Sequence, residues 1–290
     1  MRITHRMLQE SLLRNIQNDM SRLAEAQRRV ATGKRIHSAS DDPVGAAQVM
    51  RAAQGLRALD QYRRNNSAAR TRLDTEEAVL SQLTDLLARA REIATAMGTD
   101  TASGTALSAG HVEVVQLLDQ VIQLGNTSVG EGYIFGGNQT ASPPFQSDGS
   151  YTGDGGELQV DIDTGYRVDT NHSGDEMFVS SGVISSFVKL RDALAASDTA
   201  AARNSLGDLT TAFSNTQVFL SETGARLRQL DVAMQNLEAL DTSLTASKMA
   251  AETVPLEQAT VEFLGIQNTL QAALASTARI LSTNLTDFLR

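Results

Sequence analysis

Apolar residues recur at helical spacing near both ends of this chain. The N-terminal stripe is Leu13, Ile16, Met20, Leu23, Gln27 and Val30. The C-terminal stripe is Leu256, Ala259, Phe263, Ile266, Leu270 and Ala273, and Leu281, Leu285 and Phe288 extend its apolar face. A stripe with this period must pack against another helix. The large apolar members of both stripes are therefore predicted to form an assembly seam, since domains usually end in short frayed tails.

Two other roles for the stripes are open. They could complete an ordinary bundle within the chain, or they could lie on a membrane surface as amphipathic helices. The position of the stripes at the two ends favours assembly. The membrane alternative is disfavoured because few basic residues flank the second stripe and tryptophan is absent.

Long helical patterns fill much of the chain between these stripes. One helix is expected over residues 44–97. Its heptad positions include Leu73, Glu76, Leu80, Leu83, Leu87, Ala90, Ala94 and Met97. A turn at residues 98–104 leads to a shorter helix with Val114, Leu117, Val121 and Leu124 on one face. A second long helix is expected to run to Val254, with heptad positions at Leu206, Leu209, Phe213, Thr216, Leu220, Thr223, Leu227, Leu230, Met234, Leu237, Asp241 and Leu244. The pattern predicts a mainly α fold, a long antiparallel coiled-coil-like rod formed by the N- and C-terminal halves.

The pattern changes in residues 131–182. Nine acidic residues stand against one base, Arg167, in this window, while the whole chain has a net charge of −9. Short β-rich runs at residues 133–135, 158–162 and 166–168 are separated by Gly, Asp and Pro clusters, which predicts a small antiparallel β insertion. Three domains are therefore expected: a terminal helical assembly domain (1–42 with 256–290), a helical rod (43–130 with 183–255) and the acidic insertion (131–182).

The first helix is expected to break at a loop that carries a helix start. Gly33 follows the first stripe, and glycine is common just beyond a helix end. Ser40, Asp41 or Asp42 can cap the next helix, and Pro43 suits its first position. A hinge loop is predicted from Gly33, Arg35, Ile36, Ser38, Asp41, Asp42 and Pro43.

The search for chemistry gives no catalytic, cofactor or metal site. Cysteine is absent, and the four histidines (His5, His37, His111 and His172) are isolated in the sequence and are interpreted as exposed or capping residues. A calcium site in the acidic window is disfavoured. Oxygen ligands are offered by Asp148, Asp154, Glu157, Asp161 and Asp163, but their spacing fits no calcium loop. The arginines are interleaved with acids, which disfavours nucleic-acid binding. Neither a cleaved secretory signal nor a membrane span is expected. An enzyme is the least favoured class.

The loop from Val30 to Gly45 resembles that of the flagellin superfamily, in which a helix ends near a glycine and resumes after Asp-Asp. The run Tyr133-Ile134-Phe135-Gly136-Gly137, followed by Pro143-Pro144-Phe145, is similar to the hook-associated protein 3 branch, as is Asp287-Phe288-Leu289.

This resemblance implies an extracellular structural component of the bacterial flagellum, exported by the type III apparatus. It would form a junction ring with copies of itself, between a hook-associated protein 1 type adapter and flagellin, and would use a flagellar export chaperone. No membrane or nucleic acid is implied as a partner. A short flagellin that polymerises into the filament itself is the alternative, and an adhesive module carried by residues 131–182 is a further one.

Overall fold

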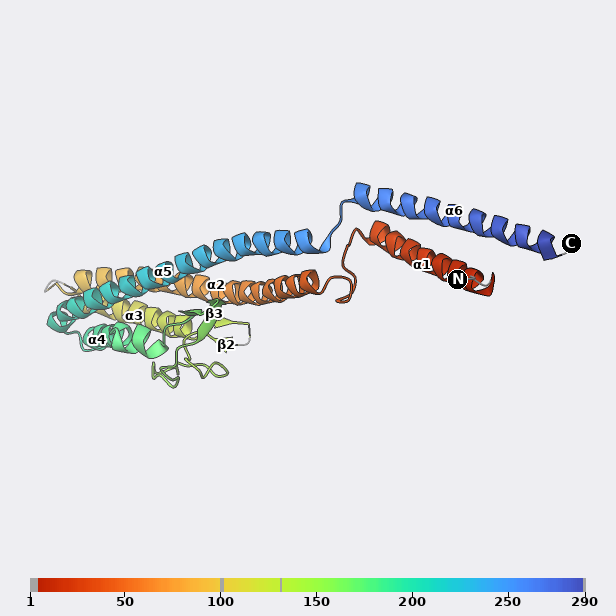
Figure 1. The fold of residues 1–290 in the computed structure, drawn as a ribbon. Helices are drawn as coiled ribbons and strands as arrows, with labels where there is room; N and C mark the ends of the chain where they lie inside the picture. The colour runs from red at the N-terminus through yellow and green to blue at the C-terminus, as the bar shows by residue number, and fades with distance from the viewer. Residues whose placement is uncertain (1–4, 100–101, 131, 289–290) are drawn as a thin grey trace. The chain divides into compact units, whose positions relative to one another are not determined.

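The computed structural model describes residues 5–99, 102–130 and 132–288. The helices are α1 (His5–Thr32), α2 (Pro43–Met97), α3 (Gly104–Gly125), α4 (Val183–Ala195), α5 (Thr199–Glu252) and α6 (Leu256–Phe288), with a short π-helix, η1 (Asp175–Ser180) (Figure 1). The strands are β1 (Ser128–Val129), β2 (Gly132–Tyr133), β3 (Gln159–Asp163) and β4 (Tyr166–Asp169). The predicted fold class, long helices with a small β-rich insertion, is confirmed. None of the described helices is long and apolar enough to cross a membrane.

The contacts divide the chain into two compact units. One combines residues 1–57 with 241–290, and the other comprises residues 58–240. The boundary falls inside α2 and inside α5, so each of these helices contributes to both units. The three-domain division expected from composition stays a prediction.

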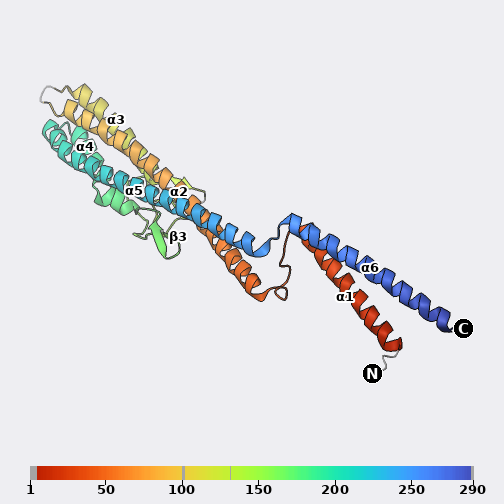
Figure 2. The ribbon, with the colours of Figure 1, turned by 45° about the horizontal axis from the view of Figure 1, so that its top comes forward.

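The first unit contains the two terminal helices, which lie side by side and run in opposite directions (Figures 1 and 2). The helix breaks are where the sequence places them. α1 ends at Thr32 and Gly33 follows with a positive φ of 67°, a conformation that glycine adopts without a steric penalty. α2 begins at Pro43, as predicted from the fixed φ of proline.

The second unit is built on the α2 and α5 segments, which lie side by side with α3 and α4 beside them (Figures 1 and 2). Its main core combines residues of α2, α3, α4 and α5. The predicted stripe of α2 provides the centre, because Leu80, Leu83 and Leu87 are completely buried. Burial of each such leucine contributes about 1.5–3 kcal/mol.

The β-rich part consists of two antiparallel two-stranded sheets, β1–β2 and β3–β4. The expected strand at residues 133–135 is only partly confirmed. Tyr133 ends β2, while Ile134 and Phe135 leave the strand and are completely buried in the helical core. The β3–β4 hairpin contributes Ile162 and Val168 to a second, smaller core on α2 and α5. The insertion is therefore packed into the helical cores at a limited set of residues, which include Ile134, Phe135, Phe145, Ile162 and Val168.

Candidate assembly surface

Part of the predicted assembly seam lies between α1 and α6. On α1, Ile16, Leu23 and Val30 are half-buried, and on α6, Phe263, Ile266 and Leu270 are half-buried. These residues lie along the closest-packed faces of the pair, where Ala26 and Ala259 are buried. Small side chains at these two positions allow the helix backbones to approach each other. Packing of α1 on α6 thus buries part of the apolar surface of the single chain.

Other seam residues remain on the surface of the single chain. Leu13, Met20 and Leu256 are each about 60% exposed. On α1 the packed line runs through Leu12, Asp19 and Ala26, one residue before Leu13, Met20 and Gln27. The sequence pattern could not separate these lines, because both have helical spacing and adjacent positions are only about 100° apart.

The exposed face of α6 continues beyond the predicted seam. Val261 is 72% exposed, and Leu264 and Leu274 are nearly half exposed. With Leu13, Met20 and Leu256 they form a set that we call the outer apolar residues. Leu281, Leu285 and Phe288, which were predicted to belong to the seam, have side chains outside the described residues. Contiguous exposed apolar surface is typical of an interaction site, which makes these residues the candidate assembly surface.

The predicted hinge loop is an ordered turn held by its two aspartates. The Asp41 carboxylate accepts the backbone N–H groups of His37 and Ser38, both at 2.9 Å, and the Ser38 hydroxyl. The bonds from the His37 and Ser38 backbone, then the Ser38 hydroxyl, lower the pKa of Asp41 to about 2. Asp42 caps α2 by accepting the N–H groups of Val44 and Gly45. Of the capping candidates considered, Asp42 takes that role.

The connector that leads into α2 also binds the connector that leads into α6. The Arg35 N–H donates to the Glu252 carbonyl at 2.7 Å, and the Val254 N–H donates to the Gly33 carbonyl at 3.0 Å. Lys34 forms an ion pair with Glu252. The buried Ile36 side chain packs close to Gly45. The sequence indicates one connector but not its partner, because residues 33–35 and 252–254 are remote in the chain and meet only at a single β-bridge between Lys34 and Thr253.

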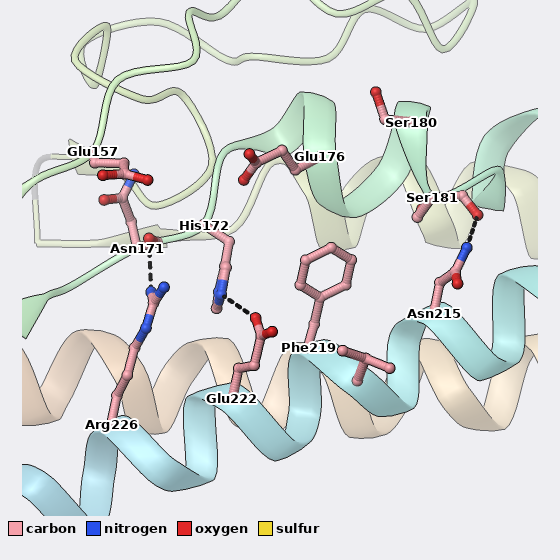
Figure 3. Close-up of a pocket in the computed structure, with 11 residues that line it drawn as sticks. Glu157, Asn171, His172, Glu176, Ser180, Ser181, Asn215, Phe219, Glu222 and Arg226 are labelled. Atoms are coloured by element: carbon pink, nitrogen blue, oxygen red, sulfur yellow. Dashed lines mark hydrogen bonds and ion pairs between the residues drawn. The ribbon is translucent and has the colours of Figure 1, made fainter.

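The second unit contains a polar pocket of about 480 Å³ beside the β-rich part (Figure 3). His172, Glu222 and Arg226 are among its lining residues. The interpretation of His172 as exposed or capping is wrong, since its side chain is only 5% exposed and its Nδ1 lies 2.5 Å from Oε1 of the buried Glu76. The sequence carried no signal for this pair, which spans 96 residues.

The acidic residues considered for calcium lie in separate local contacts. Asp154 accepts the N–H groups of Asn138 and Gly156, and Asp161 pairs with Arg167. Asp148 accepts the Ser150 N–H. Across the part of the chain that the structure describes, no three His, Asp or Glu side chains are grouped so that they could hold a metal ion.

Parts of the chain are similar to known flagellar proteins. Residues 3–140 match the bacterial flagellin N-terminal helical region. Flagellar hook-associated protein 3 of Escherichia coli K12 is 30% identical over 182 residues, 62% of this chain, and the match spans only 57% of that relative's length.

Two solved structures share the fold. A putative flagellar hook-associated protein from Vibrio parahaemolyticus has a TM-score of 0.67 at 20% identity, covering 73% of this chain and 99% of that one. The flagellar junction protein FlgL from Legionella pneumophila has a TM-score of 0.59 at 17% identity, covering 71% of this chain and 100% of that one. Over part of its length the chain is therefore similar to the bacterial flagellin N-terminal helical region and to flagellar hook-associated protein 3.

Proposed function

We propose that this protein is a structural component of the bacterial flagellum that forms the junction between the hook-side adapter and the flagellin filament. The observation that carries the proposal is the set of outer apolar residues on α1 and α6, which stay exposed after these helices have packed together. Their burial against neighbouring subunits would supply the driving force for assembly. We propose no catalytic role.

The comparisons favour a junction protein over a flagellin. A flagellin-type N-terminal helical region suits either role. The match to hook-associated protein 3 spans 182 residues, more than the flagellin-type region occupies, and a Legionella pneumophila protein described as a junction protein shares the fold. A short flagellin is the second candidate. Its exposed terminal helices would drive indefinite growth, whereas a junction protein would stop after one ring.

The neighbours follow from this role. The chain would contact copies of itself in a ring, a hook-associated protein 1 type adapter on one side and flagellin on the other. Its location would be extracellular, after type III export with a flagellar chaperone. We propose residues 1–42 with 256–290 as the assembly domain, and residues 33–43 as the hinge between this domain and the helices that follow.

The decisive experiment introduces charges on the exposed face of α6. The double variant Val261→Glu/Leu264→Glu should keep the monomer folded, because Val261 is largely exposed and Leu264 about half exposed. It should not join isolated hooks that carry the adapter. Gln258→Glu is the matched control, since it adds a carboxylate at an exposed polar position of the same helix. Normal incorporation of the double variant would contradict the assigned surface.

Growth on hooks separates the two candidates. Purified protein added to hooks that carry the adapter should bind to saturation and form a cap of fixed height, seen by electron microscopy. Flagellin added afterwards should then elongate from this cap. Continuous elongation by this protein alone would identify it as a filament flagellin and would refute the junction role.

A further inference from the structure

Two polar residues that interrupt the long apolar stripes of α2 and α5 contact each other. Glu76 is the polar member of the α2 stripe from Leu73 to Met97, and Thr223 is one of the polar members of the α5 stripe. Both side chains are completely buried, and the Thr223 hydroxyl donates to Glu76 Oε1 at 2.8 Å. A buried carboxylate is costly unless it is fully bonded. The presence of Glu76 among the buried leucines of α2 therefore needs an explanation.

The third member of this contact comes from the β-rich part. His172 lies between β4 and η1, and its ring Nδ1 lies 2.5 Å from Glu76 Oε1, while its backbone N–H donates to Glu76 Oε2 at 3.3 Å. The ring packs edge-to-face on Phe219 with centroids 5.2 Å apart. Its other nitrogen, Nε2, faces Glu222 on α5 at 3.3 Å, as Figure 3 shows. The buried carboxylate of Glu76 on α2 is thus hydrogen-bonded both to Thr223 of α5 and to His172 of the segment that follows the hairpin.

The position of this contact separates two apolar cores. On one side lies the main core, which includes Val79 and Leu80 of α2. On the other lies the small core, in which Leu73 and Leu227 meet Ile162 and Val168 of the hairpin. Two apolar side chains on a hairpin do not define a unique position on a repeating leucine surface, because apolar packing is non-directional.

The other polar contacts to the hairpin do not define its position either. Asn65 and Asn66 of α2 donate to the backbone carbonyls of Asp161 and Ile162 at 2.7 and 3.0 Å. Backbone carbonyls recur along a strand, so a hairpin displaced by two residues would still offer an acceptor to these amides, although the irregular register between Asp161 and Asp163 is local. The His172 side chain, in contrast, can hydrogen-bond to Glu76 only when the segment that follows the hairpin lies in one position.

We propose that Glu76, Thr223 and His172 form a docking key that fixes where the β3–β4 hairpin lies on α2 and α5. The key restricts the hairpin to one position and adds little to the stability of the fold. A single buried polar residue acts in the same way when it selects one register of a coiled coil. This inference concerns the second unit alone and does not depend on the proposed flagellar role.

The test measures the position of the hairpin in the full-length chain. Because the protein has no cysteine, spin labels can be placed at Thr164→Cys in the hairpin turn and Thr210→Cys on α5, both exposed positions. The unmodified key should give one narrow distance distribution. The apolar triple variant Glu76→Leu/His172→Leu/Thr223→Val should keep its Tm or raise it, while the distribution broadens or splits.

A matched pair of threonines separates the effect of losing the hydrogen bond to Glu76 from the effect of replacing any buried threonine. Thr216 and Thr223 are both completely buried on the same stripe of α5, but the Thr216 hydroxyl donates to Ala212 of its own helix at 2.9 Å. Thr223→Val should lower the Tm by about 2–4 °C, because Glu76 loses a donor, and Thr216→Val should change it by less.

The single variant His172→Ala also tests whether the key fixes the position of the hairpin, and it leaves the residues of the α2 and α5 stripes unchanged. It should broaden the label distribution and raise amide exchange in residues 159–169. A narrow, unshifted distribution in His172→Ala or in a folded triple variant would overturn the proposal. So would a large fall in the Tm of the triple variant, including failure to fold, since the key would then be a stability element.

Discussion

At the scale of single residues, aromatic side chains that follow β2 pack into the main helical core. Phe135 is completely buried, and its ring meets Phe178 edge-to-face at 5.2 Å. Phe135→Ala should lower the free energy of unfolding by about 3–5 kcal/mol, because it leaves a cavity in the main core. Urea unfolding followed by circular dichroism measures this change.

The matched control for Phe135 is another aromatic residue of the insertion. Tyr166 is 49% exposed in the β3–β4 hairpin, so Tyr166→Ala should cost less than about 1 kcal/mol. Similar losses in the two variants would show that Phe135 is not part of a cooperative core.

The hinge loop should respond to strong acid through Asp41. Its hydrogen bonds lower the pKa to about 2, below the usual 3.8 of an aspartate, so the carboxylate stabilises the loop fully above about pH 4. That contribution is lost as the pH falls toward 2 and the carboxylate is protonated. The amide NMR signals of His37 and Ser38, which donate to Asp41, should titrate with a midpoint near pH 2. Titration near pH 4 would contradict the bonded geometry, and Asp41→Asn should abolish the transition.

At the scale of elements, sequence periodicity located the helices well, because each long helix buries one continuous stripe. The start of α2 at Pro43 followed from local chemistry alone. The strand β1 and the π-helix η1 escaped prediction, since two residues of strand and one wide helical turn leave no period to detect. The partners of the connectors and of His172 escaped it because hydrogen bonds between remote segments carry no local pattern.

The packing of α1 on α6 can be tested at a single small residue. Ala26 is 3% exposed at the contact, whereas Ala24 of the same helix is exposed. Ala26→Leu should push the helices apart and cost about 1–3 kcal/mol, measured as faster amide exchange in residues 16–30. Ala24→Leu should leave exchange unchanged. Equal effects of the two substitutions would contradict the observed face of α1.

At the scale of the whole molecule, the apolar cores and the proposed assembly surface fall in different units. Both apolar cores lie in residues 58–240, together with the docking key. The unit of residues 1–57 and 241–290 contains α1, α6 and the outer apolar residues. The terminal helices bury only a narrow line against each other, and helix pairs with so little packing are marginal in water.

This division predicts the behaviour of a fragment. Residues 58–240 expressed alone should fold cooperatively, with a Tm close to that of the main transition of the full chain, because no core residue of either cluster is removed. The same fragment should not bind hooks that carry the adapter, since it lacks the terminal helices, and sedimentation with those hooks measures this directly. A fragment that binds hooks as well as the full chain would move the assembly surface to the second unit. An unfolded fragment would mean instead that the terminal unit supports the cores, and the division of stability from assembly would be wrong.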